Sequence, residues 1–355
     1  MATTLLTRPS SASVASTGIL SRVLAGASRE TGNPRALAHG LSVVICTRRR
    51  PRSLARCLDG IAASSLRPNR LFVIDASPDR ETELHVAYRA DLEALAGGVE
   101  YVRVARNLAG LTRQRNFALD LIATDAVAFF DDDVVLGEGC LAEMEQVLRS
   151  DARIVGVGAV APTESGAPGR LHRVRRVLGI VDGLTPGRYC RSGMSIAWRG
   201  LDRGRPVVDV EWLPGYAMLW RTADAREVRF DEGFAGYANG EDLDFGLRMS
   251  RRGRLVIATH ASLRHEHVAA GRPDPYRLGR MTVENAWVIQ HRALPARTWR
   301  DTARFAWAFG VDTIVQTAAL ASPPGPSWRI AHARGRLASL VRLLAGNGQQ
   351  RPLVY

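Results

Sequence analysis

Along the first half of the chain, short apolar runs typical of strands alternate with segments in which apolar residues recur at helical spacing. Four short apolar runs have the length and the β-branched and aromatic content of buried strands. They lie at 41–46, 71–74, 101–104 and 126–130. Helical spacing occupies the segments between them, at 53–63, about 80–95 and 111–122. Strands that alternate with helices predict a parallel sheet with helices on its faces. We therefore expect residues 41–133 to form a nucleotide-binding α/β unit.

The second half of the chain is less regular. Residues 154–160 have the pattern of one more strand, and a Gly- and Arg-rich loop is predicted over about 163–192. A loop of that length inside a domain is usually functional or mobile. Residues 212–220 are apolar. Two helical stretches, about 299–320 and 328–344, flank a proline-rich turn at 322–326 and predict a helical C-terminal extension.

The charge of the chain is strongly positive and is carried by arginine alone. Its 355 residues include 48 basic residues, none of them lysine, against 35 acidic ones, which gives a net charge of +13. Guanidinium groups bind phosphate in two-point fashion, but codon bias in a GC-rich genome explains the arginine count as well. We expect phosphate binding only at specific positions. The arginines are scattered and no nucleic-acid motif accompanies them, so we expect no nucleic-acid partner.

Cysteine usage and the first residues bear on the compartment. The four cysteines form no CxxC pair and have no histidine at zinc spacing, which predicts free thiols in a reducing compartment such as the cytoplasm. Residues 1–38 are rich in Ser, Ala, Thr and Arg, with a single acidic residue, and predict a disordered tail. An organelle transit peptide is the alternative interpretation of that tail.

The C-terminal extension, residues 293–355, is basic. Four apolar residues recur at the spacing of one helical face. They are Trp307, Val311, Ile314 and Val315. Such a face suits either peripheral contact with the anionic inner face of the plasma membrane or packing on the protein's own core. Asp312 and Gln316 interrupt the segment and argue against a membrane-spanning helix.

Three successive carboxylates, Asp131, Asp132 and Asp133, follow the apolar run at 126–130. α/β proteins place ligand sites at the carboxyl ends of their strands. Such a cluster repels itself unless a divalent cation or bound cationic groups offset the charge. The alternative is a solvated acidic turn or a cap for the next helix.

A second acidic cluster, residues 240–244, contains Glu241, Asp242 and Asp244 and leads into a helical pattern. Acidic residues in the first turn of a helix are favoured by its dipole, so a helix cap is one interpretation. The other is a catalytic carboxylate that works with a metal at the first cluster. A metal holds a leaving diphosphate while a carboxylate takes a proton from the attacking hydroxyl.

From about residue 41 to about 291, the chain resembles the family 2 glycosyltransferases with the GT-A fold. The resemblance rests on the order and spacing of several short motifs. They lie at 41–47, 49–51, 72–79, 113–116, 131–133, 212–215, 230–234, 240–244 and at His265. The resemblance implies an α/β fold with a mostly parallel central sheet, and an inverting transfer from a nucleotide sugar.

The resemblance also implies roles for residues of the donor site. Thr47 and Asp75 would line the nucleotide pocket, with Asp75 accepting a hydrogen bond from the base. Arg115 and Asn116 would close over the base or the diphosphate. Each of these has a structural alternative, as a turn residue, a strand-end cap or a surface charge.

Further roles concern the metal and the chemistry. In this family the first or middle aspartate of the triplet, here Asp131 or Asp132, meets the ribose, and the last ligates Mg²⁺ or Mn²⁺. Asp133 is therefore the expected metal ligand. His265 matches a histidine that completes the metal site, and His267 is close enough in sequence to be the true equivalent. Asp242 matches the catalytic base, and Glu241 the residue that helps to hold the acceptor or a loop.

Two departures from the family pattern leave the donor nucleotide open. Ala76 stands where an acidic residue, an amide or glycine is common, and Phe117-Ala118 follows Asn116 where a glycine is frequent. UDP, dTDP and GDP sugars all remain candidates. The acceptor is expected to be a hydroxyl of a glycan, a lipid-linked glycan or a small molecule.

These observations predict a glycosyltransferase domain over 39–292, with a nucleotide-binding half at 39–135 and an acceptor half at 136–292. The tail at 1–38 precedes it and the basic extension at 293–355 follows it. Two other functions stay open: a degenerate nucleotide-binding protein without turnover, and a nucleotidyltransferase. The intact acidic clusters argue against the first, and the absence of glycine in Thr47-Arg48-Arg49-Arg50 argues against the second.

Overall fold

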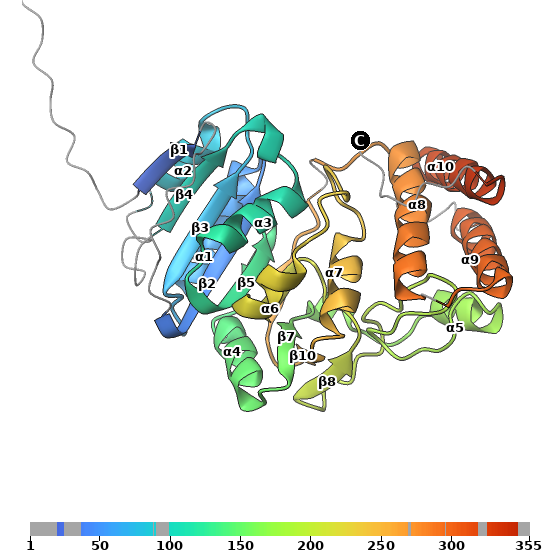
Figure 1. Ribbon diagram of the computed structural model, residues 1–355, viewed down its shortest axis with the longest axis horizontal. Coiled ribbons are helices and arrows are strands. Elements are labelled where there is room, and N and C mark those ends of the chain that lie inside the picture. Colours follow the sequence, from blue (N-terminus) through green and yellow to red (C-terminus); the bar gives the residue numbers. More distant parts are fainter. Residues whose placement is uncertain are drawn as a thin grey trace, which may run out of the picture.

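A mixed nine-stranded sheet forms the centre of the protein (Figure 1). The computed structural model describes residues 20–24, 37–87, 89, 99–268, 271–294, 296–318 and 325–346. The strand order is β1-β4-β3-β2-β5-β9-β7-β10-β8. Successive side chains of a strand point to opposite faces of the sheet. Accordingly, Val43 and Ile45 belong to one buried apolar cluster and Val44 to the other.

The first half of the chain builds the parallel part of this sheet, as the sequence predicted. Four neighbouring parallel strands form it. They are β2 (Leu37–Thr47), β3 (Arg70–Asp75), β4 (Val99–Val104) and β5 (Thr124–Asp131). The connecting helices are α1 (Pro51–Ala62), α2 (Glu81–Ala87) and α3 (Leu111–Leu121). The helix predicted to about residue 95 reaches positions outside the described residues.

The second half extends the sheet with strands of mixed direction. Strand β9 (Ala217–Arg221) lies antiparallel between β5 and β7 (Ile154–Gly158). Beyond β7 follow β10 (Arg254–Ala258) and β8 (Val207–Val210). The strand predicted at 154–160 is thus present, whereas β8 and β10 were not predicted. Helices α4 (Cys140–Ser150) and α6 (Thr222–Val228) belong to this half.

Two short elements lie where the sequence predicted no regular structure. Residues 20–24 of the predicted tail form β1 (Leu20–Leu24), which pairs in parallel with β4. The exposed edge of a sheet offers unpaired N–H and C=O groups, and a short segment of the tail can pair with them through its backbone. The predicted loop at 163–192 contains α5 (Arg170–Val177), an arginine-rich helix that has no buried residue. Residues 1–19 and 25–36 of the predicted tail lie outside the described residues.

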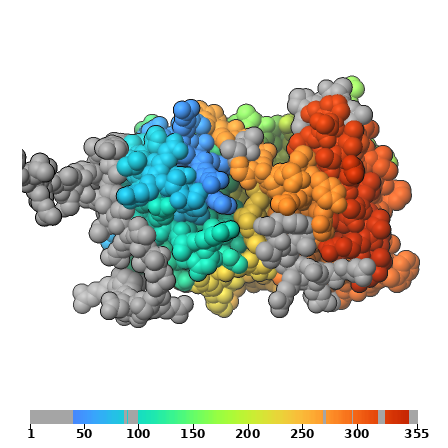
Figure 2. All heavy atoms as spheres, turned by 90° about the horizontal axis from the view of Figure 1, so that it is seen from above, coloured from blue at the N-terminus to red at the C-terminus, as the bar shows by residue number. Residues whose placement is uncertain are grey.

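Three long helices form a separate layer beside the sheet (Figure 1). They are α8 (Pro275–Ala293), α9 (Trp299–Ala318) and α10 (Pro326–Leu344). Their presence agrees with the predicted C-terminal helices, although α8 belongs to the layer as well. In Figure 2 they occupy one end of the molecule, opposite the sheet. Within the described residues, no helix combines the length and the apolar character needed to cross a bilayer. The predicted turn at 322–326 lies largely outside the described residues.

Helix α9 buries a face different from the one singled out in the sequence. Phe305, Phe309 and Asp312 are buried, whereas the side chains of Trp307 and Ile314 are 56% and 68% exposed. The predicted face therefore points largely outward. The face of α9 that packs against the rest of the protein is the one that carries Phe305, Phe309 and Asp312.

Helices α8 and α10 touch backbone to backbone at two glycines. A Cβ atom on Gly279 would collide with the carbonyl oxygen of His332, and one on Gly335 with the carbonyl oxygen of Tyr276. Gly310 in α9 has room for a methyl group, with its nearest neighbour 3.7 Å away.

These contacts predict opposite effects of the same substitution at two glycines. Alanine in place of a glycine inside a helix gains about 1 kcal/mol of helix propensity. Gly310→Ala should therefore raise the free energy of unfolding. Gly279→Ala should lower it by about 1–3 kcal/mol, because the helices must separate to admit the methyl group. Chemical denaturation of both variants measures the difference, and equal stabilisation of both would contradict the close contact.

Candidate functional site

The carboxyl ends of β2, β3 and β5 bring the first predicted site residues to one edge of the sheet. The strand register places Thr47 beside Asp75 and Cys46 beside Asp131. Ligand sites of α/β proteins occupy this edge. These residues therefore lie at the carboxyl ends of their strands, where the sequence predicted them.

Asp132 is held by groups of the protein itself. The Thr47 hydroxyl donates to one of its carboxylate oxygens at 2.7 Å, and the Arg50 guanidinium donates to the other at 3.0 Å. Burial nevertheless raises the pKa of Asp132 to about 6, because desolvation outweighs both donors. Thr47 and Asp132 thus bind each other beneath the site, whereas the side chain of Asp131 is 33% exposed.

Asp133 lies next to His265 because two short strands pair. Strand β6 (Val134–Leu136) is antiparallel to β11 (Leu263–His265), with Val134 opposite His265. The distance from His265 Nε2 to Asp133 Oδ1 is 3.4 Å. The second carboxylate oxygen of Asp133 accepts from the Val268 N–H. Residues 132 positions apart in sequence thereby form a pair at the edge of the sheet.

Glu164 and His267 join this pair. Glu164 Oε1 lies 3.1 Å from His265 Nδ1 and 3.1 Å from His267 Nε2. The Tyr216 hydroxyl donates to the other oxygen of Glu164. Ligand atoms of Glu164, His265 and His267 all lie within 4.8 Å of one another. Both histidines named as alternatives in the sequence are thus in one cluster.

The donor set of this cluster fits a divalent cation such as Mn²⁺. Carboxylate oxygen and imidazole nitrogen are both suitable ligands for such ions. Burial lowers the pKa of His265, but the adjacent carboxylates of Asp133 and Glu164 outweigh it and raise the pKa to about 9. At neutral pH the His265 imidazole is therefore protonated and pairs with the carboxylates of Asp133 and Glu164. A cation that binds this imidazole must displace its proton.

Arg115 connects the first acidic cluster to the second. Its buried guanidinium donates to Glu241 at 2.9 Å, to Asp131 at 3.2 Å and to the carbonyl oxygen of Gly215 at 2.7 Å. It also lies over the rings of two phenylalanines. The protein itself thus supplies hydrogen-bond acceptors for the guanidinium, and Arg115 holds Asp131 and Glu241 in position. This is a different environment from the base or diphosphate contact that the resemblance implied.

Asp242 stands in the first turn of α7 (Glu241–Met249). Gly240, with a φ of +92°, gives the chain the left-handed turn that starts this helix. Asp242 accepts from the N–H of Gly215 at 3.0 Å and from that of Leu243 at 2.8 Å. Burial still raises the pKa of Asp242, because desolvation outweighs these two hydrogen bonds. A raised pKa is what a carboxylate needs to accept a proton near neutral pH.

The pKa of the neighbouring Glu241 is raised as well. Burial and the charge of Asp242 raise its pKa to about 8, although Arg115 lies 2.9 Å away. The two acids thus have unequal environments: Glu241 is bound to Arg115, while Asp242 lines a cavity of about 330 Å³. Gly215 links the clusters, because its N–H binds Asp242 and its C=O binds Arg115.

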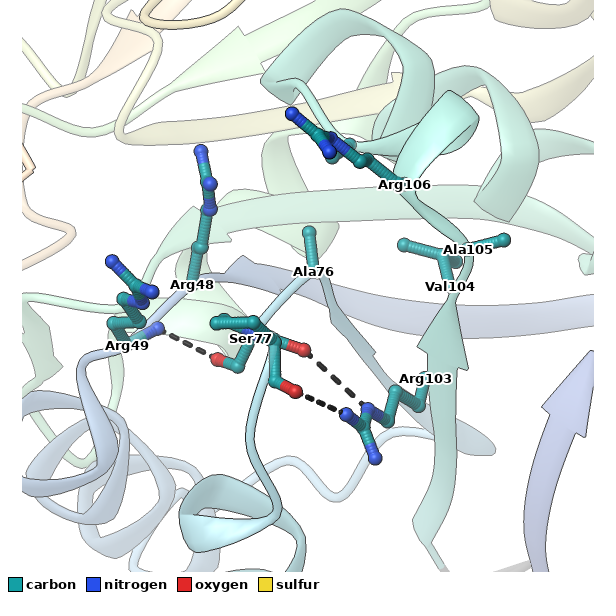
Figure 3. A pocket seen from close by; sticks show the side chains of 10 residues that line it. Arg48, Arg49, Ala76, Ser77, Arg103, Val104, Ala105 and Arg106 are labelled. Carbon is teal, nitrogen blue, oxygen red and sulfur yellow. Dashed lines mark hydrogen bonds between the residues drawn. The ribbon is translucent and has the colours of Figure 1, made fainter.

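A pocket of about 500 Å³ opens beside the ends of β2, β3 and β4 (Figure 3). We call it the arginine pocket, because four arginines line it: Arg48, Arg49, Arg103 and Arg106. Arg103 donates to the carbonyl oxygens of Ser77 and Pro78. The side chains of Arg48 and Arg106 extend away from Ser77 toward the same side (Figure 3). The pocket therefore presents cationic hydrogen-bond donors.

Two further predicted site residues have their polar groups bonded inside the protein. Asp75 has no exposed area, and it accepts from the Tyr101 hydroxyl and from the N–H and hydroxyl of Ser77. Asn116 makes two hydrogen bonds to backbone groups of Phe230 and donates to Glu232. In this structure Asp75 shapes the wall of the arginine pocket, and Asn116 fixes the loop that precedes α7.

Several residues of the site were not predicted. Glu164 lies 101 positions from His265 in sequence and carries no motif, so only the fold brings them together. Arg103 and Arg106 stand at the end of a predicted strand. Their position at the ligand edge of the sheet, before a helix, was the sequence signal that could have identified them. Arg50 was noted within a motif but given no role.

Comparison with known proteins gives a consistent answer. Residues 42–201 match the family model described as Glycosyl transferase family 2. The mannosyltransferase PcManGT from Pyrobaculum calidifontis, solved with GDP-Man and Mn²⁺, has 14% identity and a TM-score of 0.50. That similarity covers 88% of each chain and confirms the predicted GT-A type of fold.

Other comparisons are weaker. TarS 1-349 from S. aureus, solved with UDP-GlcNAc, has 14% identity over 86% of this chain and 92% of that chain, with a TM-score of 0.46. The chain spans 54% of the longer TarS chain. No curated protein matches the sequence.

Proposed function

We propose that the protein transfers a sugar from a nucleotide-diphosphate sugar to a hydroxyl with inversion, and the premise of this proposal is the match of residues 42–201 to Glycosyl transferase family 2. The observation that carries the proposal is the link through Arg115 and Gly215. These residues hold Asp131 of the first cluster and Asp242 of the second in one hydrogen-bonded unit. A displacement needs groups for the leaving diphosphate and for the attacking hydroxyl at one place.

The proposed step uses Asp242 as the general base. The acceptor hydroxyl gives its proton to the Asp242 carboxylate while its oxygen forms a bond to the anomeric carbon. The bond from that carbon to the diphosphate oxygen breaks on the opposite face, and the nucleoside diphosphate leaves with the electron pair. Attack opposite the leaving group inverts the anomeric centre. Glu241, tied to Arg115, orients the loop in which Asp242 stands.

The donor is proposed to lie between the arginine pocket and the acidic triplet. Arg48 and Arg106 supply donors to a base or phosphate oxygen, and the partly exposed Asp131 supplies an acceptor for ribose hydroxyls. Thr47, Asp75 and Asp132 support these surfaces from beneath through the hydrogen bonds described above. UDP, dTDP and GDP sugars fit this chemistry equally.

Asp133 and His265 are the proposed ligands of Mg²⁺ or Mn²⁺, with Glu164 and His267 adjacent. A bound divalent cation would offset the charge that develops on the leaving diphosphate. The protein itself orients Asp133 through the N–H of Val268.

The test of this function is a donor screen with the purified protein. Release of nucleoside diphosphate from UDP, dTDP and GDP sugars is measured with Mn²⁺ and with chelator. We expect one donor class to be turned over, with loss of at least tenfold in chelator and in Asp133→Asn, because carboxylate and metal jointly offset the diphosphate charge. The surface variant Asp202→Asn should behave as the wild type.

The screen also separates the alternatives. Nucleotide binding without release from any donor would support the degenerate binding protein instead. Release of pyrophosphate from a nucleoside triphosphate would support the nucleotidyltransferase. Full turnover in chelator would contradict the role given to Asp133 and His265.

We also propose a peripheral contact with an anionic membrane on the cytoplasmic side. Exposed apolar side chains on α9 and α10, including Trp307, Ile314 and Val341, support it. So does the basic character of this part of the chain. The acceptor in that case is a lipid-linked glycan presented at the surface.

A further inference from the structure

The cavity beside Asp242 reaches from the second acidic cluster to the C-terminal helices. It has a volume of about 330 Å³, within the range of small-molecule pockets. Residues of α5, α7, α8, α9 and α10 line it. We call it the acceptor cavity. Its wall therefore comes largely from residues beyond 201, outside the part that matches the family model.

One end of the acceptor cavity is cationic. Arg175 Nε donates to one oxygen of Asp312 at 2.7 Å, and Arg336 Nη2 donates to the other at 2.9 Å. Gln316 donates to the second oxygen as well. Two guanidinium groups thus share one carboxylate, which leaves this end with a surplus positive charge. Arg175 keeps 27% of its side chain exposed.

Polar atoms in the wall of the cavity lack partners within the described part of the chain. Arg336 is 2% exposed and its Nε has no hydrogen-bond partner, and Asn285 is 1% exposed and its Oδ1 has none. A buried donor or acceptor without a partner costs about 1–3 kcal/mol. Both atoms belong to side chains that line the cavity. The wall also contains a set of apolar side chains: Ile180, Met194, Trp212, Ile289 and Phe309.

We propose that this cavity binds the acceptor, and that the acceptor is an amphiphilic hydroxyl compound with an oxyanion, either carboxylate or phosphate. Its anionic group lies at Arg175 and Arg336, its apolar part lies against the wall, and its hydroxyl faces Asp242. The proposal rests on the proposed function for the role of Asp242. The proton of the hydroxyl passes to Asp242 and the new C–O bond replaces the bond to the diphosphate, as in the step above.

Three probes that share an octyl chain and a glucose ring test the charge preference. They are octyl glucoside, octyl glucuronide and octyl glucoside 6-phosphate. Calorimetry without donor measures their binding, so turnover is not needed. We expect at least one anionic probe to bind about tenfold or more tightly than the neutral one, because hydrogen bonds to charged groups are the stronger ones. The anionic probe with the higher affinity identifies the oxyanion as carboxylate or phosphate.

The matched variants are Arg175→Gln and Arg176→Gln. Both arginines stand on α5, but only Arg175 lines the cavity. The preference should disappear in Arg175→Gln and persist in Arg176→Gln. Equal binding of all three probes, or a preference retained in Arg175→Gln, overturns the proposal. Free glucuronate should bind more weakly than octyl glucuronide. Equal affinity would contradict the proposal that the apolar part of the acceptor binds the apolar side chains of the wall.

The outcome is distinct from that of the proposed function. An anionic preference without sugar transfer from any donor would contradict the glycosyltransferase activity and leave the binding cavity in place. Transfer to the neutral probe at the same rate as to the anionic ones would keep the activity and overturn the anionic acceptor.

Discussion

Replacing Asp242 by asparagine should lower kcat by roughly 10²- to 10⁴-fold, the range over which a general base acts. Asparagine keeps the size of the side chain and can still accept from the N–H of Gly215. The donor touches other residues in the proposed site, so donor affinity should barely change. Steady-state kinetics with the accepted donor, and calorimetry with its nucleotide, measure the two effects separately.

The pH profile gives a second readout for Asp242. The base must be ionised, and burial raises its pKa, so the wild-type rate should fall as pH decreases through that raised pKa. This acidic limb should be absent from the residual rate of Asp242→Asn. Glu241→Gln serves as the matched control, because glutamine can still accept from Arg115. If Glu241→Gln loses the larger share of kcat, Glu241 is the base and Asp242 is a helix cap.

Replacing Arg115 by methionine should lower the free energy of unfolding by about 3–5 kcal/mol, the cost of leaving a buried charge without its partner. Arg115 is 1% exposed and is the shared donor of Asp131, Glu241 and Gly215. The double variant Arg115→Met/Glu241→Gln should recover part of the loss, since it removes one of the stranded acids. Denaturant unfolding monitored by circular dichroism measures each step.

An exposed arginine provides the control for this prediction. Arg252 pairs with Asp224 and Glu227 at the surface. Surface ion pairs contribute about 0–1 kcal/mol, so Arg252→Met should be nearly neutral. A loss in Arg115→Met no larger than that in Arg252→Met would mean that the two acidic clusters do not depend on their common cation.

The parallel half of the sheet was readable from sequence because its strands are buried on both faces. Continuous apolar runs such as that before Asp131 are typical of strands inside a parallel sheet that helices cover on both faces. The carboxyl ends of those strands meet at one edge of the sheet. Strands β8 and β10 escaped prediction because β8, at the edge of the sheet, keeps three of its four residues partly or fully exposed, and β10 is short and follows an arginine-rich turn. Tertiary pairing, rather than local pattern, makes them strands.

The candidate site shows the same division. Asp131, Asp133, Asp242 and His265 stand in recognisable motifs, and the fold brings their surroundings together as one unit. The contacts of Arg115 and Asp75 could not be predicted, because a motif specifies a residue type but not whether its side chain faces a ligand or the interior. Arg115 binds groups from distant parts of the chain, and Asp75 binds the nearby Ser77 and the Tyr101 hydroxyl of the next strand. Glu164 had no local signal at all.

The glycine contacts between α8 and α10 have a consequence for how acceptor range can change in evolution. At Gly279 and Gly335 the two helices meet through their backbones, so no intervening side chain is available to be enlarged or trimmed. Divergence toward a larger or smaller acceptor would instead proceed through side chains that line the acceptor cavity, such as Met194, Ile289 of α8 and Phe309 of α9. Directed libraries aimed at new acceptors should therefore vary those positions and keep both glycines fixed.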